Sequence, residues 1–329
     1  MSRSSPALRP APMRLIDSHA HLQAGAFAWD LAGVIADARE AGVERILVPG
    51  WDAASSAAAV SLAGEWGMDA AVGAHPHDAA LVTDADWAAI VELARASVVV
   101  AIGETGLDYD RLHSPRKAQL ASLRRHLRLS LDTGKPAILH CRSAVGKRDA
   151  QDALIAELRS AGFGGAAARD AFGDCPPAVL HSFSGPVDYA TAALEMGISI
   201  AFGGLVFRQG EAASADVARL VPAELLLIET DSPYLAPPGV PRHKPARAAR
   251  AGAAGTPALS GAVGAPAAPT EDATPATDIT ARFRGRRNSP EWVRITAEWL
   301  AKQRGESPDT IGAGLVAAYD ATFRSRSQG

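Results

Sequence analysis

The sequence predicts an α/β fold, a (β/α)₈ TIM barrel in which eight parallel strands alternate with helices. Short apolar or β-branched runs recur eight times, and each is followed by residues with helical periodicity. The runs are mostly apolar before their last residues, as expected of strands that are buried on both faces. The chain has 329 residues, and such a barrel commonly takes about 250 as a single domain. A doubly wound open sheet is the alternative fold that the same pattern allows.

The elements can be placed along the chain in order. Strands are predicted at 14–19, 45–50, 69–75, 98–104, 136–141, 178–183, 198–204 and 225–231. Helices are predicted at 30–41, 53–66, 87–96, 116–133, 148–161, 188–196, 290–304 and 308–323. Ser289 is expected to cap the helix at 290–304, with Pro290 at its first position.

One segment interrupts this alternation. Residues 242–284 are rich in Ala, Pro, Gly and Thr and have no apolar period, so they cannot bury enough surface to offset their ordering entropy. We therefore expect a barrel with a disordered, low-complexity insertion between strand 8 and helix 8. Residues 14–241 and 285–325 then form a single TIM-barrel domain, preceded by a disordered leader at 1–13. The insertion is basic at both ends, so it either guides a nucleic-acid strand electrostatically or is a solvated segment without a role.

Composition excludes several classes of protein. Hydrophobic residues make up 47% of the chain, yet no apolar run approaches the roughly 18 residues that span a bilayer, so no membrane association is expected. Two cysteines cannot form a disulfide framework, which favours a cytoplasmic location. A net charge of -3 argues against nonspecific coating of nucleic acid, although a local basic patch remains compatible with it. No stable protein partner is implied, and a monomer is expected.

The chemistry is concentrated where the predicted strands end. Barrel enzymes carry their active sites at the carboxyl ends of the strands, and five of the eight strands here end in a potential metal ligand. These residues are His19, His21, Glu104, His140, His181 and Asp231. Any single histidine of this kind is commonly a hydrogen-bonded core residue, but four of the nine histidines in the chain share this position. The set predicts a site for divalent metal ions, with room for two if Glu104 offers one oxygen to each.

The same stretches identify a family resemblance. DSHAHL (17–22), GAHPHD (73–78), IGETGLDYDR (102–111), GKPAILHCR (134–142), VLHSFSG (179–185), GGLVF (203–207), IETDSPYLAPPG (228–239) and GRRNSPEWV (285–293) follow one another in order. Together they resemble the TatD family of metal-dependent hydrolases (TatD-type deoxyribonucleases), in the amidohydrolase superfamily. The resemblance implies a distorted TIM barrel and a metal-dependent phosphodiesterase that acts on DNA, often as a 3'-to-5' exonuclease.

The resemblance also implies roles for individual residues. His19, His21, Glu104 and Asp231 would bind one metal ion, and Glu104, His140 and His181 the second. Glu104 stands where other branches of the superfamily bridge their metals with a carbamylated lysine, which favours the TatD branch. The last helix departs from the family pattern, because GLVAAYDATF lacks the usual asparagine, and no role is inferred there.

A mechanism follows from the charges. Two cations lower the pKa of water toward neutrality and screen the charge that builds up on phosphorus. Asp231 is the expected general base, and Glu104 is the second catalytic residue. The resemblance favours Mg²⁺ as the cofactor, whereas a site with four imidazoles is chemically suited to Mn²⁺ or Zn²⁺.

Residues that bind the substrate are less sharply indicated. His75, at the exit of strand 3, is expected to donate a hydrogen bond to a substrate phosphate, with a purely structural role as the alternative. Arg142 and Arg208 follow strands 5 and 7 on the same face and are expected to pair with phosphates, or else to form surface salt bridges.

Two other functions fit the same constellation. The metal site could hydrolyse a different ester or amide, such as an aminoacyl-tRNA, a lactone or a cyclic amide, because it activates water in each case. Alternatively, the protein could be a metal-stabilised interaction protein without catalytic activity. The complete set of six ligands argues against a scaffold, which has no need for an open metal centre.

Overall fold

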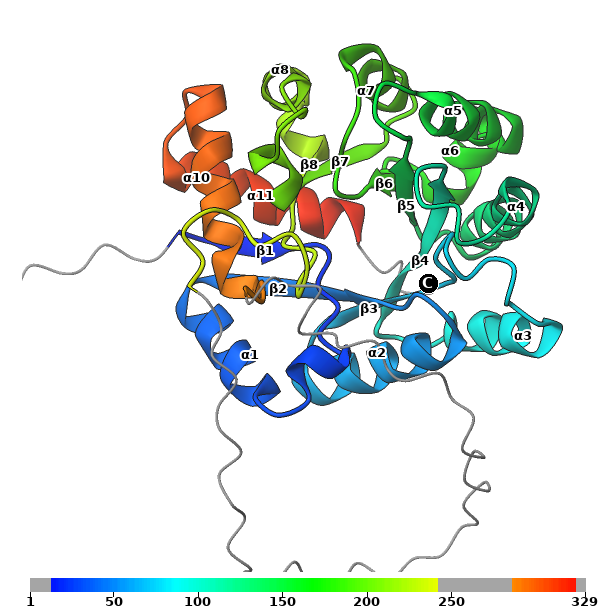
Figure 1. Cartoon of the computed structure of the whole chain (residues 1–329), viewed down its shortest axis with the longest axis horizontal. Coiled ribbons are helices and arrows are strands. Elements are labelled where there is room, and N and C mark those ends of the chain that lie inside the picture. The colour runs from blue at the N-terminus through cyan, green and yellow to red at the C-terminus, as the bar shows by residue number, and fades with distance from the viewer. Residues whose placement is uncertain (1–12, 242–285, 324–329) are drawn as a thin grey trace, which may run out of the picture.

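The computed structural model of the chain describes residues 13–241 and 286–323. In these residues eight parallel strands form one sheet in the order β1 to β8, which curls into a nearly closed barrel surrounded by helices (Figure 1). The predicted TIM barrel is therefore confirmed, and the open doubly wound sheet is excluded. Residues 1–12 of the predicted leader at 1–13 and the insertion at 242–284, with its proposed basic guide, lie outside the described residues, whereas Met13 is described and buried.

The strands overlap all eight predicted runs. They are β1 Leu15–Asp17, β2 Val43–Pro49, β3 Asp69–Val72, β4 Val99–Asp108, β5 Ala137–Arg142, β6 Ala178–Leu180, β7 Ser199–Phe202 and β8 Leu226–Ile228. Most are shorter than predicted, but β4 continues to Asp108, four residues past its predicted end. It does so because residues 105–108 pair with residues 139–142 of β5. This extension brings further polar side chains to the carboxyl end of the barrel.

The helices alternate with the strands as expected. They are α1 Leu31–Glu40, α2 Ala53–Trp66, α3 Asp84–Leu93, α4 Arg116–Thr133, α5 Asp149–Ala161, α6 Ala166–Phe172, α7 Val187–Leu194, α8 Ala213–Leu220, α10 Val293–Arg304 and α11 Pro308–Thr322. The short helices α6 and α8 were not predicted. Short 3-10 turns lie at Gly25–Phe27, Gly204–Phe207, Ala223–Leu225 and Pro290–Trp292.

Helix starts depend on their caps. α3 begins three residues earlier than predicted, because Thr83 and Asp86 form a capping box at its amino end. Ser289 occupies the predicted cap position before Pro290, but its side chain makes no capping hydrogen bond, so that part of the prediction is wrong. A 3-10 turn fills the place of the expected first helical turn, and α10 starts at Val293.

The barrel is closed irregularly between its first and last strands. β1 and β8 form no continuous ladder, and their segments are joined instead by single hydrogen bonds and one isolated bridge between Ala20 and Ser232. The carboxylate of buried Asp17 accepts from the backbone N–H and the hydroxyl of Thr230, at 2.9 and 2.6 Å. The barrel is therefore irregular at this seam, in keeping with the distorted TIM barrel that the family resemblance implies, although the resemblance did not indicate its place.

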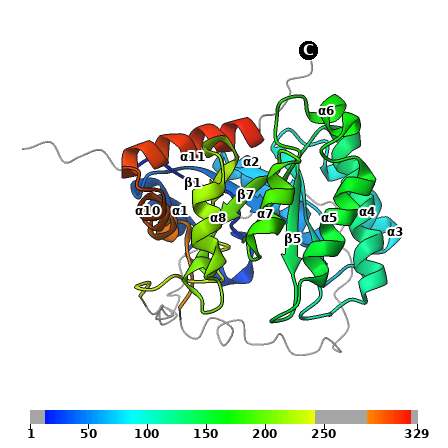
Figure 2. The ribbon, with the colours of Figure 1, turned by 90° about the horizontal axis from the view of Figure 1, so that it is seen from above.

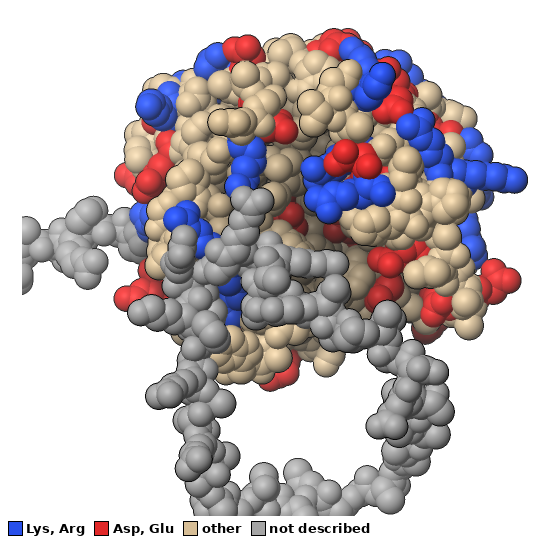
Figure 3. Space-filling view, in the orientation of Figure 1, with Lys and Arg blue, Asp and Glu red and all other residues tan. Residues whose placement is uncertain are grey.

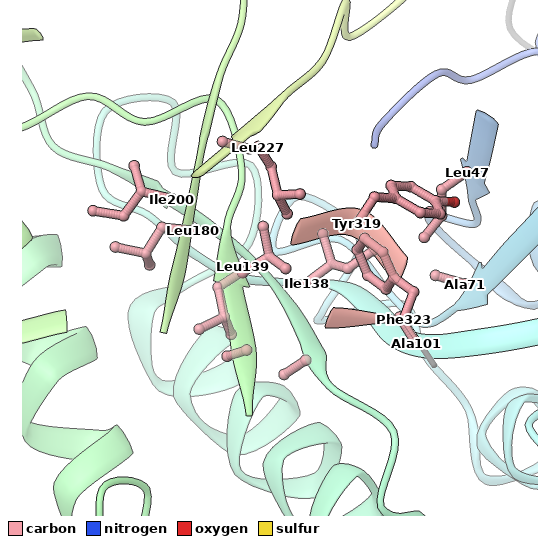
Figure 4. Packing of buried hydrophobic residues seen from close by; sticks show 14 of the residues in the cluster. Leu47, Ala71, Ala101, Ile138, Leu139, Leu180, Ile200, Leu227, Tyr319 and Phe323 are labelled. Carbon is pink, nitrogen blue, oxygen red and sulfur yellow. The ribbon is translucent and has the colours of Figure 1, made fainter. Parts of the chain in front are cut away.

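Helix α11 covers the amino end of the barrel. In Figure 2 it lies on the side of the molecule opposite to the arrowhead of β5. The hydroxyl of Tyr319 donates to Asp69, the first residue of β3, at 2.8 Å, and Figure 4 shows Tyr319 and Phe323 beside core residues of the strands. The core thus fills the barrel and its amino end, which leaves the carboxyl end for a site. The space-filling view of Figure 3 shows a hollow with acidic atoms in it near the middle of one face.

Candidate metal centre

The six predicted ligands meet at the carboxyl end of the barrel, around the carboxylate of Glu104. Its two oxygens face different histidines. The Nε2 atoms of His19 and His21 lie 3.2 and 3.6 Å from Oε2. The Nδ1 atom of His140 and the Nε2 atom of His181 lie 3.1 and 2.9 Å from Oε1. The carboxylate therefore stands between two pairs of imidazoles.

Asp231 completes one of these two sets. Its Oδ1 atom lies 3.5 Å from Nε2 of His21 and 3.9 Å from Nε2 of His19. Its backbone N–H donates to the carbonyl of His19 at 2.8 Å, so the β1 and β8 segments are joined at the ligands themselves. Asp231 has a φ of 56°, a left-handed conformation that Asp tolerates better than most residues. The chain thus turns immediately after β8 and keeps this carboxylate beside the two histidines of β1.

The approach of β4 to β5 positions the other set. Gly106 has a φ of 140°, and a Cβ atom there would overlap the carbonyl oxygen of His140. Only glycine allows β4 to pass this close to β5 in that conformation. Glu104 and His140 are thereby brought together on adjacent strands, and the pairing of β4 with β5 is irregular in register between Ile102 and Thr105.

Polar groups behind the imidazoles indicate which ring nitrogen can bind a cation. His140 faces the buried carboxylate of Asp108 with Nε2 at 3.4 Å, and His181 faces the buried carboxylate of Glu229 with Nδ1 at 3.3 Å. Because a carboxylate is an acceptor, each of these nitrogens would carry the proton in the neutral form of the imidazole that binds a cation. The lone pairs of His140 Nδ1 and His181 Nε2 then point toward Glu104. In the same way His21 donates from Nδ1 to the carbonyl of Pro49, at 3.2 Å, and presents Nε2.

His75 is arranged in the opposite way. Its Nε2 atom lies 3.2 Å from Oε1 of Glu104, so it belongs to the cluster geometrically. However, its Nδ1 atom accepts a hydrogen bond from the backbone N–H of His77, at 3.0 Å. A neutral imidazole that accepts at Nδ1 must carry its proton on Nε2. Burial lowers the pKa of His75 to about 4, which keeps it neutral. His75 is therefore a hydrogen-bond donor directed into the site, whereas a metal ligand needs a free lone pair there.

The ionised carboxylates of the cluster favour the binding of positive charge, either protons or metal cations. Burial alone would raise the pKa of Glu104, but His75, His181 and His19 lower it well below its usual range. Burial likewise opposes a charge on His181, yet Glu104 and Glu229 raise its pKa well above the usual value. The carboxylates are thus ionised and draw positive charge toward themselves. Protons or metal cations can supply that charge.

The donor set fits divalent cations. Donor atoms of His19, His21 and Glu104 lie within 4.8 Å of one another, and those of His75, Glu104 and His140 do as well. Imidazole nitrogens with carboxylate oxygens are ligands that Zn²⁺, Mn²⁺ and related ions accept. Lone pairs and anionic oxygens that converge at 2.9 to 3.6 Å repel each other unless a cation lies among them. The residues present therefore match a metal centre, with His75 as a donor beside it.

The two predicted arginines lie apart from this cluster. Arg142 is exposed at the end of β5, where its Nε donates to Asp110 at 2.9 Å. Arg208 is also exposed and follows the 3-10 turn after β7. Neither has a hydrogen bond or ion pair to the six ligands among the described residues. Their predicted contact with substrate phosphates stays a prediction.

Sequence reasoning missed the residues that orient the ligands. Asp108 accepts from His77 Nε2 at 2.8 Å as well as facing His140, and Glu229 accepts from the N–H of Ser182 at 2.5 Å. The sequence did hold a signal for Glu229. In an extended segment, side chains two residues apart point to the same face, so Glu229 and Asp231 would both point toward the site. Asp108 lay beyond the predicted end of its strand. His126, buried in α4, also helps, because its Nε2 accepts from the N–H of Ala74 at 3.0 Å, next to His75.

The fold and the site together define a metal-dependent hydrolase built on a TIM barrel. Comparison with known proteins places the chain in one family: the family model described as TatD related DNase matches residues 16–324, and the chain belongs to that family. It is 35% identical over 289 residues to the uncharacterized metal-dependent hydrolase YabD of Bacillus subtilis, covering 88% of this chain and 90% of that protein.

Two further relatives connect the chain to a nuclease and to a solved fold. It is 34% identical over 240 residues to the 3'-5' ssDNA/RNA exonuclease TatD of Escherichia coli strain K12, covering 70% of this chain and 86% of that protein. The crystal structure of YjjV, a TatD homolog from Escherichia coli K12, superposes with a TM-score of 0.72 at 24% identity. It covers 95% of this chain and 99% of that one, which supports the fold. In the described part of the chain, no helix is long and apolar enough to cross a membrane.

Proposed function

We propose that this protein is a dinuclear, divalent-metal-dependent phosphodiesterase that removes nucleotides from single-stranded DNA, as a 3'-to-5' exonuclease. The observation that carries the proposal is the position of the Glu104 carboxylate, whose two oxygens face separate groups of histidines. The names of the curated relatives in the TatD family support a nucleic acid as substrate.

The proposed ligands follow the two oxygens of Glu104. Oε2 together with His19, His21 and Asp231 would hold one cation, and Oε1 together with His140 and His181 the other. Bound cations would supply positive charge that lowers the pKa of water and screens a phosphodiester. Mg²⁺ is proposed first from the family resemblance, while Mn²⁺ and Zn²⁺ fit the four imidazoles.

The protein's own residues would supply the remaining chemistry. His21 and neighbouring histidines lower the pKa of Asp231 against the effect of burial, so its carboxylate is ionised near neutral pH. Its side chain is 15% exposed, compared with 3% for Glu104, which makes it the more accessible of the two carboxylates. Asp231 would accept a proton from the attacking water as the bond from phosphorus to the leaving oxygen breaks. His75 would donate from Nε2 to a phosphate oxygen, and Arg142 and Arg208 would attract the rest of the strand.

The test is cleavage of single-stranded DNA by metal-stripped protein to which Mg²⁺, Mn²⁺ or Zn²⁺ is returned. Substrates labelled at the 5' or the 3' end report the polarity. We expect metal-restored release of mononucleotides from the 3' end. Asp231→Asn should lower kcat by about a hundredfold or more, because the amide cannot accept the proton.

A matched control separates this effect from general damage. Asp320→Asn removes a carboxylate on α11, at the amino end of the barrel, where Asp320 pairs with Arg45 at 3.3 Å. It should retain wild-type activity. If the metal-loaded wild-type protein does not cleave DNA, the nuclease function is wrong, and another ester or an amide becomes the substrate to seek. We also propose a monomer that works in the cytoplasm, in keeping with the free cysteines Cys141 and Cys175.

A further inference from the structure

The loop after β2 carries a tryptophan whose backbone is fixed to the metal centre. The carbonyl of Trp51 accepts from the N–H of His75 at 2.8 Å, and the carbonyl of Gly50 accepts from the N–H of Glu104 at 2.9 Å. The N–H of Trp51 donates to the hydroxyl of Ser55 at 2.9 Å, at the capped start of α2. Trp51 is therefore held by the segments that position a ligand and a hydrogen-bond donor of the site.

The indole ring lies at the edge of the cluster. Its centroid is 5.4 Å from that of His21, with an angle of 71° between the rings. Tyr234, from the segment after β8, also meets His21, with centroids 5.9 Å apart at 75°. Its N–H donates to the carbonyl of Asp231 at 2.8 Å, and the residue is 37% exposed. Two aromatic side chains from distant parts of the chain thus contact the same imidazole, at the open end of the barrel.

Packing of the core does not account for Trp51. Trp66, Trp87 and Trp299 pack against the hydrophobic core, whereas Trp51 is not among the residues that do so. Trp51 is partly exposed, and the ring that it contacts is a proposed metal ligand. A large apolar ring that is held in place but only partly covered is suited to contact a flat ligand.

We propose that Trp51, together with Tyr234, stacks on the nucleobase next to the phosphate that is cleaved. This inference rests on the proposed nuclease function and names the part of the substrate that the rim recognises. In a nucleotide only one sugar separates the phosphate from the base. A phosphate bound at the cluster would therefore place its base close to His21, where the two aromatic side chains lie. Every base has a flat π-face, so stacking on aromatic side chains tolerates any sequence. Such a contact suits an enzyme that moves along a strand of mixed sequence.

The test compares two single-stranded DNAs that differ only at the 3' end. One is intact, and the other carries abasic residues at its last two positions, so that phosphates and sugars remain while the bases are absent. Trp51→Leu removes the ring, and Trp51→Phe retains an aromatic face. Trp66→Leu, at the opposite end of α2, is the matched control for loss of a tryptophan.

The wild-type protein and the Trp66→Leu variant should prefer the intact DNA by about tenfold in kcat/KM, a value in keeping with one base stacked on one aromatic ring. Trp51→Leu should lose this preference, through a higher KM on intact DNA with the abasic substrate unaffected. Trp51→Phe should retain most of it. Equal losses on both substrates would overturn the inference, because they would mean that Trp51 only supports His21. An unchanged preference in Trp51→Leu would also overturn it. A wild-type protein that cleaves neither DNA would refute the nuclease function first, and this inference with it.

Discussion

The two oxygens of Glu104 divide the centre into two unequal halves. On the Oε1 side, the Nδ1 atom of His181 is hydrogen-bonded to the buried carboxylate of Glu229 at 3.3 Å, and the Nε2 atom of His140 lies within ion-pair distance of the buried carboxylate of Asp108, at 3.4 Å. On the Oε2 side, His21 is backed only by the carbonyl of Pro49, and the Nδ1 atom of His19 is buried without a hydrogen-bond partner among the described residues. The Oε2 side also lies on the irregular seam between β1 and β8, and it includes the more exposed carboxylate, Asp231.

This difference teaches how one set of ligand types can make two different sites. A carboxylate that accepts from the outer N–H of an imidazole fixes the orientation of the ring. It also raises the basicity of the other ring nitrogen more than a carbonyl acceptor does, so the imidazole binds a metal ion more strongly. We therefore expect the Oε1 side to bind its cation more tightly and the Oε2 side to bind a more exchangeable one. The Oε2 side, where weaker cation binding is expected, also carries the proposed general base Asp231 and the aromatic residues Trp51 and Tyr234. It therefore lies closer to the proposed reacting groups.

The largest expected effect comes from removing Glu104, the ligand that the two cations are proposed to share. Glu104→Gln eliminates the negative charge that both halves use, so it should lower kcat by about a thousandfold or more and weaken both cations. Metal content after equilibrium dialysis and the rate of DNA cleavage measure the two effects. A variant that still binds one cation at wild-type affinity would show that Glu104 belongs to one half alone. Asp320→Asn again serves as the control.

A smaller effect is expected from the carboxylates behind the Oε1 side. Asp108→Asn and Glu229→Gln keep the size of the side chain but present an amide to a histidine N–H. Each should weaken metal binding on that side by about 10- to 100-fold, as the loss of such partners typically does. Calorimetric titration with Mn²⁺ should then show the tighter of two binding events weakened and the other retained. Equal weakening of both events would contradict the asymmetry.

The smallest effect concerns pH. Glu104 and Glu229 raise the pKa of His181 above 6.5 despite burial, whereas burial lowers the pKa of His19. A raised pKa means that His181 holds a proton up to a higher pH, and a cation must displace that proton to bind. Affinity on the Oε1 side should therefore rise with pH until the raised pKa of His181 is passed, by at most about tenfold per pH unit. Affinity that is independent of pH on both sides would contradict this assignment.

The convergence of the six candidate ligands could be predicted because each follows an apolar run, and the carboxyl ends of barrel strands meet in one place. The support behind them could not be predicted in the same way. Asp108 reaches the site only because β4 continues along β5, a pairing that the apolar run ending at Glu104 does not reveal. The proton positions on His21 and His75 depend on the carbonyl of Pro49 and the N–H of His77, which are backbone groups without a sequence signature. The helices α6 and α8, of seven and eight residues, were also missed, although the eight-residue helix α7 was predicted.

The most direct test of the central claim is to load metal-stripped protein with Mn²⁺ and record its electron paramagnetic resonance spectrum with the number of bound ions. If Glu104 bridges two cations, the protein binds two Mn²⁺ per chain. Their spectrum shows the many closely spaced lines of a coupled pair, and Glu104→Gln abolishes them. A single bound Mn²⁺, or two ions with the simple spectrum of isolated Mn²⁺, would contradict the dinuclear centre.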